Sequence, residues 1–206
     1  MKGLSIAAAA AQMGVELTAD HQQQLEHYLQ LLSRWNRAYN LTAIRDPKKM
    51  VTHHILDSLS ILPFMEGERV ADLGSGAGLP GIPIALLYPE IEVVMVDSNS
   101  KKSRFIQQAI LELGLANASV VHSRVEELRP DPLFDMVVSR AFTSLSRFLV
   151  LSSPLLKSGG VAVAMKGKWP EQGDGEVIGG FELERVAAVT VPGISAERHM
   201  VICRKV

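Results

Sequence analysis

The sequence contains a single cysteine, Cys203, among its 206 residues. One cysteine excludes both an intramolecular disulfide and a zinc site built from cysteines. The chain also lacks an unbroken apolar run long enough to span a bilayer, and the alanine-rich stretch at 7–11 has neither the length nor the cleavage pattern of a secretory signal. We therefore expect a cytoplasmic protein with no membrane-spanning segment.

Excess charge of one sign is lacking too. The formal net charge is −1, so no basic field over the whole molecule indicates binding to nucleic acid. A polyanionic partner would have to be held by a local patch of cations. Apolar residues make up 47% of the chain, which is enough for one α/β domain and a small extension.

The most informative stretch runs from residue 69 to residue 83. The apolar run 70–73 predicts a buried strand, and Gly74, Gly76 and Gly78 follow it at alternate positions. A helix is predicted from about Pro80. Glycines permit positive φ and let the backbone approach a ligand closely, so strand, glycine turn and helix predict the first half of a nucleotide-binding unit.

An acidic residue supports this interpretation. The apolar run 91–96 predicts a second strand that ends at Asp97, 23 positions after Gly74 (97 − 74). An acid at about this offset reaches the ribose hydroxyls of an adenosine ligand. Residues 76–81 formally match the dinucleotide pattern, which leaves a NAD(P)-dependent oxidoreductase open. The order Asp72-x-Gly74-x-Gly76-x-Gly78 instead resembles the first motif of Rossmann-like S-adenosylmethionine-dependent methyltransferases, where an acid suits a zwitterionic sulfonium better than a pyrophosphate.

Residues 1–62 are predicted to form a helical extension packed on a Rossmann-like domain at 63–206. A helix over 19–39, capped by Thr18 or Asp20, has an apolar stripe expected to face that domain. The stripe consists of Leu25, Tyr28, Leu29, Leu32, Trp35 and Tyr39.

A second helix is predicted over 47–63. His53 and Asp57 share one of its faces. They are expected to form a hydrogen-bonded pair near the cofactor rather than a metal site, because a third and a fourth ligand are not evident.

The remaining pattern alternates strands and helices. A helix is predicted over 101–113, capped by Asn99 or Ser100. Its first turn carries Lys101, Lys102 and Arg104, although cations at this end of a helix oppose the helix dipole. This cluster suggests either contacts with phosphate or a solvated face. The other expected elements are strands at 118–122, 134–139, 161–165, 182–191 and 199–204, a helix at 143–156 and a mobile loop at 169–180. The last two strands are expected to form an antiparallel hairpin.

Several cations follow strand ends. Arg140 follows the strand at 134–139, and Lys166 and Lys168 follow the strand at 161–165. Open α/β sheets bind ligands at the carboxyl ends of their strands, so these cations are expected to converge on one rim.

The chain resembles the bacterial glucose-inhibited division protein B family, the guanine-N7 methyltransferases of 16S ribosomal RNA. The resemblance rests on the blocks 35–42, 54–58, 72–83, 139–141, 166–167 and 198–199. It implies S-adenosylmethionine as cofactor, with contacts at Gly74, Leu79, Val125, Glu126 and Arg140.

The chemistry expected at the site agrees with this resemblance. The sequence Ser-Arg-Ala-Phe at 139–142 lacks the Asn/Asp-Pro-Pro-aromatic motif of enzymes that methylate exocyclic amines, and Cys203 lies on a predicted terminal strand, away from any pyrimidine-C5 chemistry. The lone pair of guanine N7 needs no deprotonation, so a site that aligns the base suffices. Arg140 could hold the cofactor carboxylate or guanine O6, or form a plain ion pair. Phe142 and Trp169 could stack on a base, although core packing is the favoured interpretation for both.

The predicted substrate is 16S rRNA within the small ribosomal subunit or an assembly intermediate, acted on by a monomer. Candidate RNA contacts are His53, His54, Arg104, Lys166, Lys168 and Arg198. A non-enzymatic ribosome-assembly factor that retains the cofactor site stays open as a second interpretation.

Overall fold

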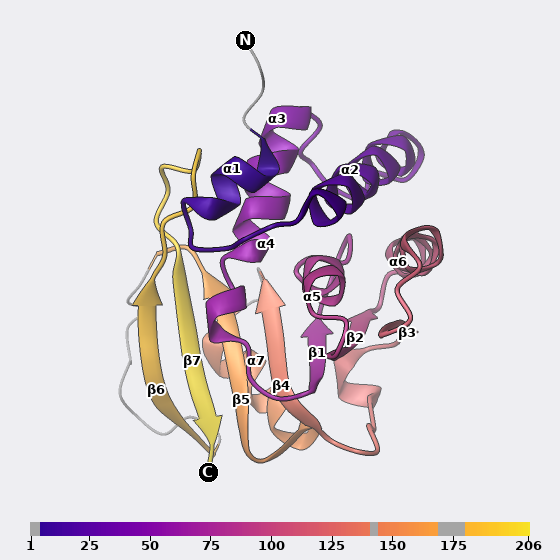
Figure 1. The fold of residues 1–206 in the computed structure, drawn as a ribbon. Helices are drawn as coiled ribbons and strands as arrows, with labels where there is room; N and C mark the ends of the chain where they lie inside the picture. Colours follow the sequence, from indigo (N-terminus) through magenta and orange to yellow (C-terminus); the bar gives the residue numbers. More distant parts are fainter. Residues whose placement is uncertain (1–4, 141–143, 169–179) are drawn as a thin grey trace.

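The computed structural model describes residues 5–140, 144–168 and 180–206 (Figure 1). Within these residues the strands form one sheet in the order β3-β2-β1-β4-β5-β7-β6. The strands are β1 (Arg69–Leu73), β2 (Glu92–Asp97), β3 (Ala118–His122), β4 (Phe134–Arg140), β5 (Leu156–Lys166), β6 (Phe181–Ala188) and β7 (His199–Lys205). Strands β1 to β5 run parallel, whereas β7 pairs antiparallel with both β5 and β6. The predicted Rossmann-like sheet with an antiparallel C-terminal hairpin is confirmed.

Helices cover both faces of the sheet, as Figure 1 shows. The described helices are α1 (Ile6–Ala11), α2 (Ala19–Tyr39), α3 (Pro47–Met50), α4 (Asp57–Leu59), α5 (Gly81–Leu87), α6 (Ser100–Leu113) and α7 (Leu145–Ser152). Val70 and Val138 belong to the core under α1–α6, while Ala71 and Val137 belong to the core on the α7 side. This alternation follows from the two-residue period of a strand that is buried on both faces. No helix in the described ranges is long and apolar enough to cross a bilayer.

The helix predicted at 19–39 forms over that range as α2. The Thr18 side chain caps it by accepting a hydrogen bond from the backbone N–H of His21. Most of the predicted stripe is buried or partly buried against the domain, but Tyr39 is 44% exposed and stacks on Trp35 with ring centroids 5.2 Å apart. The prediction that Tyr39 packs in the core is therefore wrong, because α2 ends at this residue beyond the edge of the core.

The helix predicted over 47–63 is not a continuous α-helix. A π-helix (Val51–Leu56) separates α3 from α4, and a 3₁₀ turn (Leu62–Phe64) follows. In the π-helix the Asp57 N–H donates to the carbonyl of Thr52, five residues earlier. Short π segments of this kind concentrate at functional sites.

Three other elements begin or end a few residues away from their predicted bounds. Strand β5 begins at Leu156 rather than at 161, because pairing with β4 resumes at Phe134↔Leu156 on the far side of a register shift. The helix predicted over 143–156 is described from Leu145 and ends at Ser152, where a 3₁₀ turn (Ser153–Leu155) takes over. Strand β6 ends at Ala188, three residues before the predicted end at 191 (191 − 188).

Candidate functional site

The glycine turn leaves the carboxyl end of β1 and leads into α5. Gly76 and Gly78 have φ values of +61° and +80°, a region that side chains disfavour. A Cβ on Gly78 would come within 2.7 Å of Cγ1 of Ile82, so this position is also closed sterically. A Cβ on Gly76 would meet nothing closer than the Gly74 carbonyl oxygen at 3.9 Å. The backbone at Gly76 therefore faces open space, as a turn that cradles a ligand requires.

Two buried carboxylates hold this turn in place. Asp97 accepts hydrogen bonds from the backbone N–H of Gly76 at 2.9 Å and of Asn99 at 2.8 Å. Asp72 accepts from the N–H of Gly81 at 2.9 Å, at the start of α5. Burial raises the pKa of Asp72 to about 7, and its Oδ1 atom has no partner among the described residues.

The N-terminal extension supports the same turn. The Tyr28 hydroxyl of α2 donates a 2.6 Å hydrogen bond to the carbonyl of Ala77. Tyr28 is fully buried, and burial raises the pKa of its hydroxyl. Its neutral O–H therefore remains a donor over the physiological range.

A cavity of about 630 Å³ lies between this turn and the π-helix. One wall is the glycine turn from Gly74 to Ala77, together with Leu79. The opposite wall comes from segments that are distant in sequence, at 41–44, 53–57, 165–167 and 198–200. Arg140, at the end of β4, also lines the cavity. The cavity therefore sits at the carboxyl ends of the parallel strands, as predicted.

Asp57 joins two arginines on the far wall. Its Oδ2 atom accepts from Nη1 of Arg140 at 3.1 Å, and its Oδ1 atom accepts from Nε of Arg198 at 2.8 Å. Nη1 of Arg140 also donates to the carbonyl of His53 in the π-helix at 2.7 Å. The Nη2 groups of both arginines have no partner within the described part of the chain.

The predicted His53–Asp57 pair does not form. His53 Nδ1 lies 2.7 Å from the Thr52 hydroxyl instead. Asp57 is taken by two guanidinium groups, which carry a full charge and bind a carboxylate more strongly than a neutral imidazole does. His54 is buried, with its Nε2 3.0 Å from the Thr42 hydroxyl. Burial and the charge of Arg140 lower its pKa to about 4, so its ring is neutral at physiological pH.

The structure brings only some of the predicted site residues to the cavity. Those that line it are Gly74, Gly76, Leu79, His53, His54, Arg140, Lys166 and Arg198. Gly78, which belongs to the glycine turn, does not line the cavity, and neither do Asp72 and Asp97, which hold the turn by hydrogen bonds. Val125 and Glu126 form a 3₁₀ turn (Val125–Glu127) after β3, and Glu126 is paired with Arg147.

The cations in the first turn of α6 differ in whether they reach the cavity. Lys102 lines the cavity, whereas Arg104, two residues later, is exposed away from the lining. Lys168 is also exposed and outside the lining. The predicted residues Phe142 and Trp169 and the predicted loop at 169–180, apart from Gly180, lie outside the described residues.

The sequence did not predict that Asp57 bridges two arginines, that Lys102 lines the cavity, or that the Thr42 hydroxyl lies at hydrogen-bond distance from His54. The π-helix, which marks this segment as part of the site, was visible only in the structure. Among the described residues, no cluster of three or more His, Cys, Asp and Glu side chains could hold a metal ion. Cys203 is buried in β7, and burial raises the pKa of its thiol to about 11.

Comparisons with known proteins show the family of this chain. Residues 21–201 match the family model GidB, described as rRNA small subunit methyltransferase G. A protein named ribosomal RNA small subunit methyltransferase G from Pseudomonas aeruginosa (strain LESB58) is 49% identical over 201 residues, which cover 97% of this chain and 94% of the relative. The protein of that name from Aromatoleum aromaticum is 45% identical over the full length of both chains.

Solved structures with the same fold are distant in sequence. A SAM-dependent methyltransferase from Aquifex aeolicus superposes with a TM-score of 0.61 at 18% identity, covering 81% of this chain and 97% of that one. A 16S rRNA (adenine(1408)-N(1))-methyltransferase from Catenulisporales acidiphilia gives a TM-score of 0.53 at 17% identity, covering 68% of this chain and 85% of that one. These two likenesses bear on the fold alone.

Proposed function

The chain belongs to the rRNA small subunit methyltransferase G family, and we propose that it methylates N7 of a guanine in 16S ribosomal RNA with S-adenosylmethionine as the methyl donor. When bound, that cofactor supplies a methyl group on a positively charged sulfur. The residues present fit it. The turn at Gly76 leaves open space beside the backbone, and Asp97 stands behind the turn, where sequence reasoning places the ribose contact.

The proposal of guanine N7 as the acceptor atom rests on the state of two groups that could otherwise act as a base. The only carboxylate that lines the cavity within the described ranges, Asp57, is occupied by two arginines, and the buried His54 has a low pKa and a hydroxyl partner. Neither of these two groups is arranged to remove a proton from an attacking amine. His53 and His199 also line the cavity, with their Nδ1 atoms 2.7 Å from the Thr52 hydroxyl and the Gly167 carbonyl. The N7 lone pair of guanine lies in the ring plane and attacks without losing a proton, so the site needs only to bind and align the base.

The two arginines are proposed to have separate tasks. Arg140 ends β4, which neighbours β1 and its glycine turn, so its free Nη2 is proposed to bind the cofactor carboxylate. Arg198 precedes β7, two strands further along the sheet, so its free Nη2 is proposed to bind guanine O6. A guanidinium donates well to either group. Asp57 acts through both arginines and is a positioning residue.

We place this reaction in the cytoplasm and on RNA presented by the small subunit or an assembly intermediate, acted on by a monomer. Glu126 and Val125 remain proposed contacts of the adenine edge. His53, Lys166 and Lys168 remain proposed contacts of the RNA.

The test is transfer of labelled methyl from S-adenosylmethionine to small subunits from cells that lack this protein. The product is then mapped by cleavage at 7-methylguanine. We expect label on one guanine. Label on another atom or base would refute the N7 proposal, and tight cofactor binding with no transfer to any RNA would favour an assembly factor.

Two variants test the division of tasks. Arg140→Ala is expected to weaken cofactor binding, measured by calorimetric titration. Arg198→Ala is expected to raise KM for the subunit and leave cofactor affinity unchanged. Arg185→Ala, an exposed arginine on β6 outside the cavity lining, is the matched control. Equal effects of the first two variants on both quantities would contradict separate tasks.

A further inference from the structure

One segment of this chain carries a clear excess of positive charge. Residues 34–49 contain five Lys and Arg and one Asp, a net charge of +4 (5 − 1). The whole chain carries −1, so the rest of it carries −5 (−1 − 4). A segment of sixteen residues (49 − 34 + 1) thus opposes the sign of the rest of the molecule.

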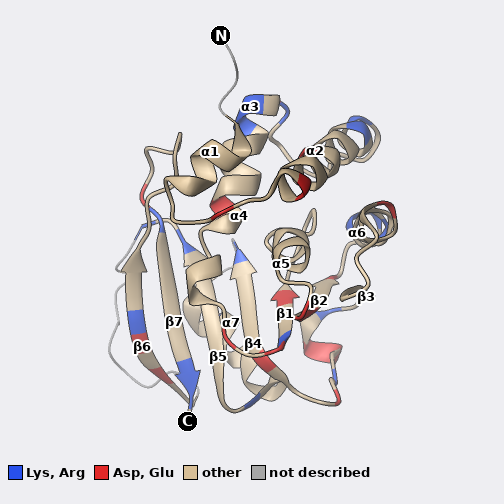
Figure 2. Ribbon diagram, in the orientation of Figure 1, with Lys and Arg blue, Asp and Glu red and all other residues tan. Residues whose placement is uncertain are grey.

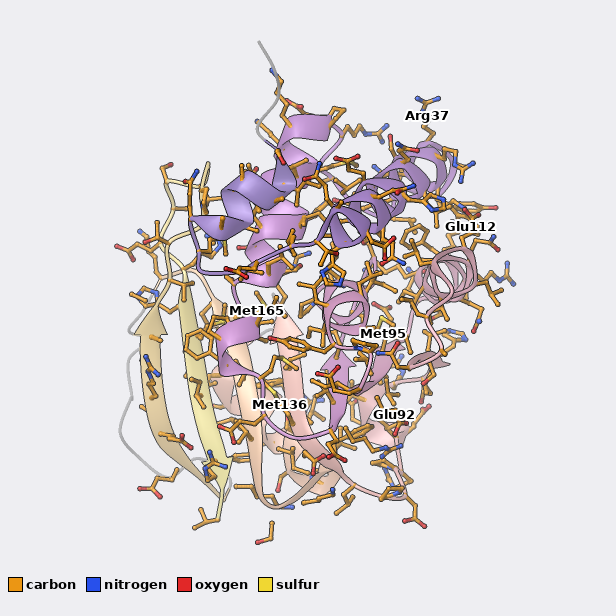
Figure 3. All side chains as sticks on the ribbon, viewed as in Figure 1. Arg37, Glu92, Met95, Glu112, Met136 and Met165 are labelled. Carbon is orange, nitrogen blue, oxygen red and sulfur yellow. The ribbon has the colours of Figure 1, made fainter. Side chains whose placement is uncertain are left out.

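Four of these cations form what we call the basic rim, namely Arg37, Arg45, Lys48 and Lys49. All four are exposed. Within the described residues none of them makes an ion pair, whereas Arg34 beside them is paired with Glu112. Figure 2 shows the blue segments at the end of α2 and on α3, and Figure 3 shows Arg37 projecting outward from α2. Asp46 is the one acid within residues 34–49, and its carboxylate accepts from the backbone N–H of Lys48 as the cap of α3. Glu26 of α2 borders the same hollow as Arg37 and accepts a hydrogen bond from Gln22.

In the chain, the basic rim adjoins residues that line the cavity. Leu41, Thr42 and Ile44 line the cavity and lie between Arg37 and Arg45 in the chain. His53 lines it four residues after Lys49 (53 − 49). Arg37 also borders a second hollow of about 460 Å³ between α2 and α3. Arg37 therefore borders a hollow beside α3, and the segments that carry the other three cations adjoin residues of the cavity lining in the chain.

We propose that the basic rim binds the phosphate backbone of the RNA that flanks the target nucleotide. Unpaired exposed cations neutralise phosphates without having to break an internal ion pair, and such contacts position a nucleic acid without reading its sequence. The exposed ring of Tyr39, within the same segment, offers a stacking surface for an unpaired base. This inference rests on the proposed function, because it assigns the path of that same substrate.

The test is a triple variant, Arg37→Gln with Lys48→Gln and Lys49→Gln, assayed for methyl transfer to undermethylated small subunits at several salt concentrations. Arg45 is left in place because it bonds the side chain of Asn40 at the end of α2. Each lost phosphate contact lowers affinity roughly fivefold at 0.1 M salt, so three contacts give on the order of a 100-fold loss in kcat/KM through KM. The slope of log kcat/KM against log salt becomes shallower by about 2 to 3. Cofactor affinity and kcat at saturation stay as in the native chain.

The matched control removes three charges elsewhere, as Arg129→Gln with Lys157→Gln and Arg185→Gln. None of these residues lines the cavity. An equal loss in the control, or native kcat/KM and salt slope in the rim variant, overturns the proposal. Failure of the native chain to methylate any RNA would instead refute the proposed function, so the two failures are distinguishable.

A second measurement uses the native chain and separates RNA from protein as the partner. Acetylation of Lys48 and Lys49 is followed by mass spectrometry with naked 16S rRNA and with whole subunits. Protection by naked RNA is expected. Protection by subunits alone that does not weaken as the salt concentration rises would assign the basic rim to a ribosomal protein and overturn the proposal.

Discussion

Replacing Asp57 by asparagine removes the negative charge that Arg140 and Arg198 share but keeps the size of the side chain. The Asp57 side chain is 8% exposed, and the arginines are 21% and 24% exposed. Removing one partner of a fully buried ion pair costs about 3–5 kcal/mol. The partial exposure of both arginines lets water screen the charges left behind, so we expect a loss of roughly 2 kcal/mol. For a chain of this length that lowers Tm by about 4–8 °C.

Activity is expected to fall by more than the loss of folded protein alone would explain. Without the charged carboxylate, Arg140 keeps the His53 carbonyl and Arg198 keeps the Glu197 carbonyl, but nothing ties the two guanidinium groups together. Their Nη2 groups are then held less firmly in direction. Misplaced binding groups of this kind commonly cost about 100-fold in rate. We therefore expect kcat/KM for methyl transfer to fall by about two orders of magnitude at a temperature where the variant is fully folded.

The matched control is Asp135→Asn. Asp135 holds Lys157 and the backbone N–H groups of Glu68 and Arg69, remote from the cavity lining. It should lower Tm and leave kcat/KM unchanged once folded. A chain with Asp57→Asn that keeps native kcat/KM, or a control that loses as much activity, would refute the positioning role.

Three further outcomes are expected. Gly78→Ala forces a Cβ to within 2.7 Å of Ile82 at positive φ, so cofactor affinity measured by calorimetric titration should fall at least tenfold, and native affinity would contradict the proposed role of the turn. Tyr28→Phe removes the hydrogen bond to the Ala77 carbonyl and should cost about 1–2 kcal/mol in urea unfolding, whereas an unchanged midpoint would show that this carbonyl finds another partner. His54 has a folded pKa of about 4, below the 6.5 of a free imidazole, so the stability contributed by the neutral ring is present above pH 6.5 and is lost as the pH falls toward 4. That loss is about 3 kcal/mol at most, and the variant His54→Gln should lack this part of the pH dependence. Identical slopes for the variant and the native chain would refute the assignment.

Local patterns in the sequence were enough to predict most elements of the fold. The apolar runs at 70–73 and 91–96 became β1 and β2 because a strand buried on both faces must be apolar throughout. Thr18 and Asn99 cap α2 and α6 as expected, since a cap depends only on the next three residues. The glycine turn, the order of strands and helices, and the family itself were all accessible from the chain alone.

The ends of the helices and the exposure of individual side chains were harder to predict from the sequence. The pattern did not show that residues 51–56 widen into a π-helix, or that Tyr39 lies past the edge of the core. Both depend on where neighbouring elements end. The same holds for Lys102 and Arg104, which share one helix turn but differ in whether they meet the cavity.

The sequence by itself thus determined the architecture and the cofactor-side turn, because both are encoded in short stretches whose residues interact with near neighbours. Only the tertiary structure decided the composition of the opposite wall. Asp57 meets Arg140 and Arg198 across separations of 83 and 141 residues. A carboxylate binds whichever cation the closed fold brings within about 3 Å, and that cation need not be its neighbour in the chain. The nearby His53 was the partner that local spacing favoured. Asp57 instead binds two arginines that are distant in the chain, one at the end of β4 and one just before β7.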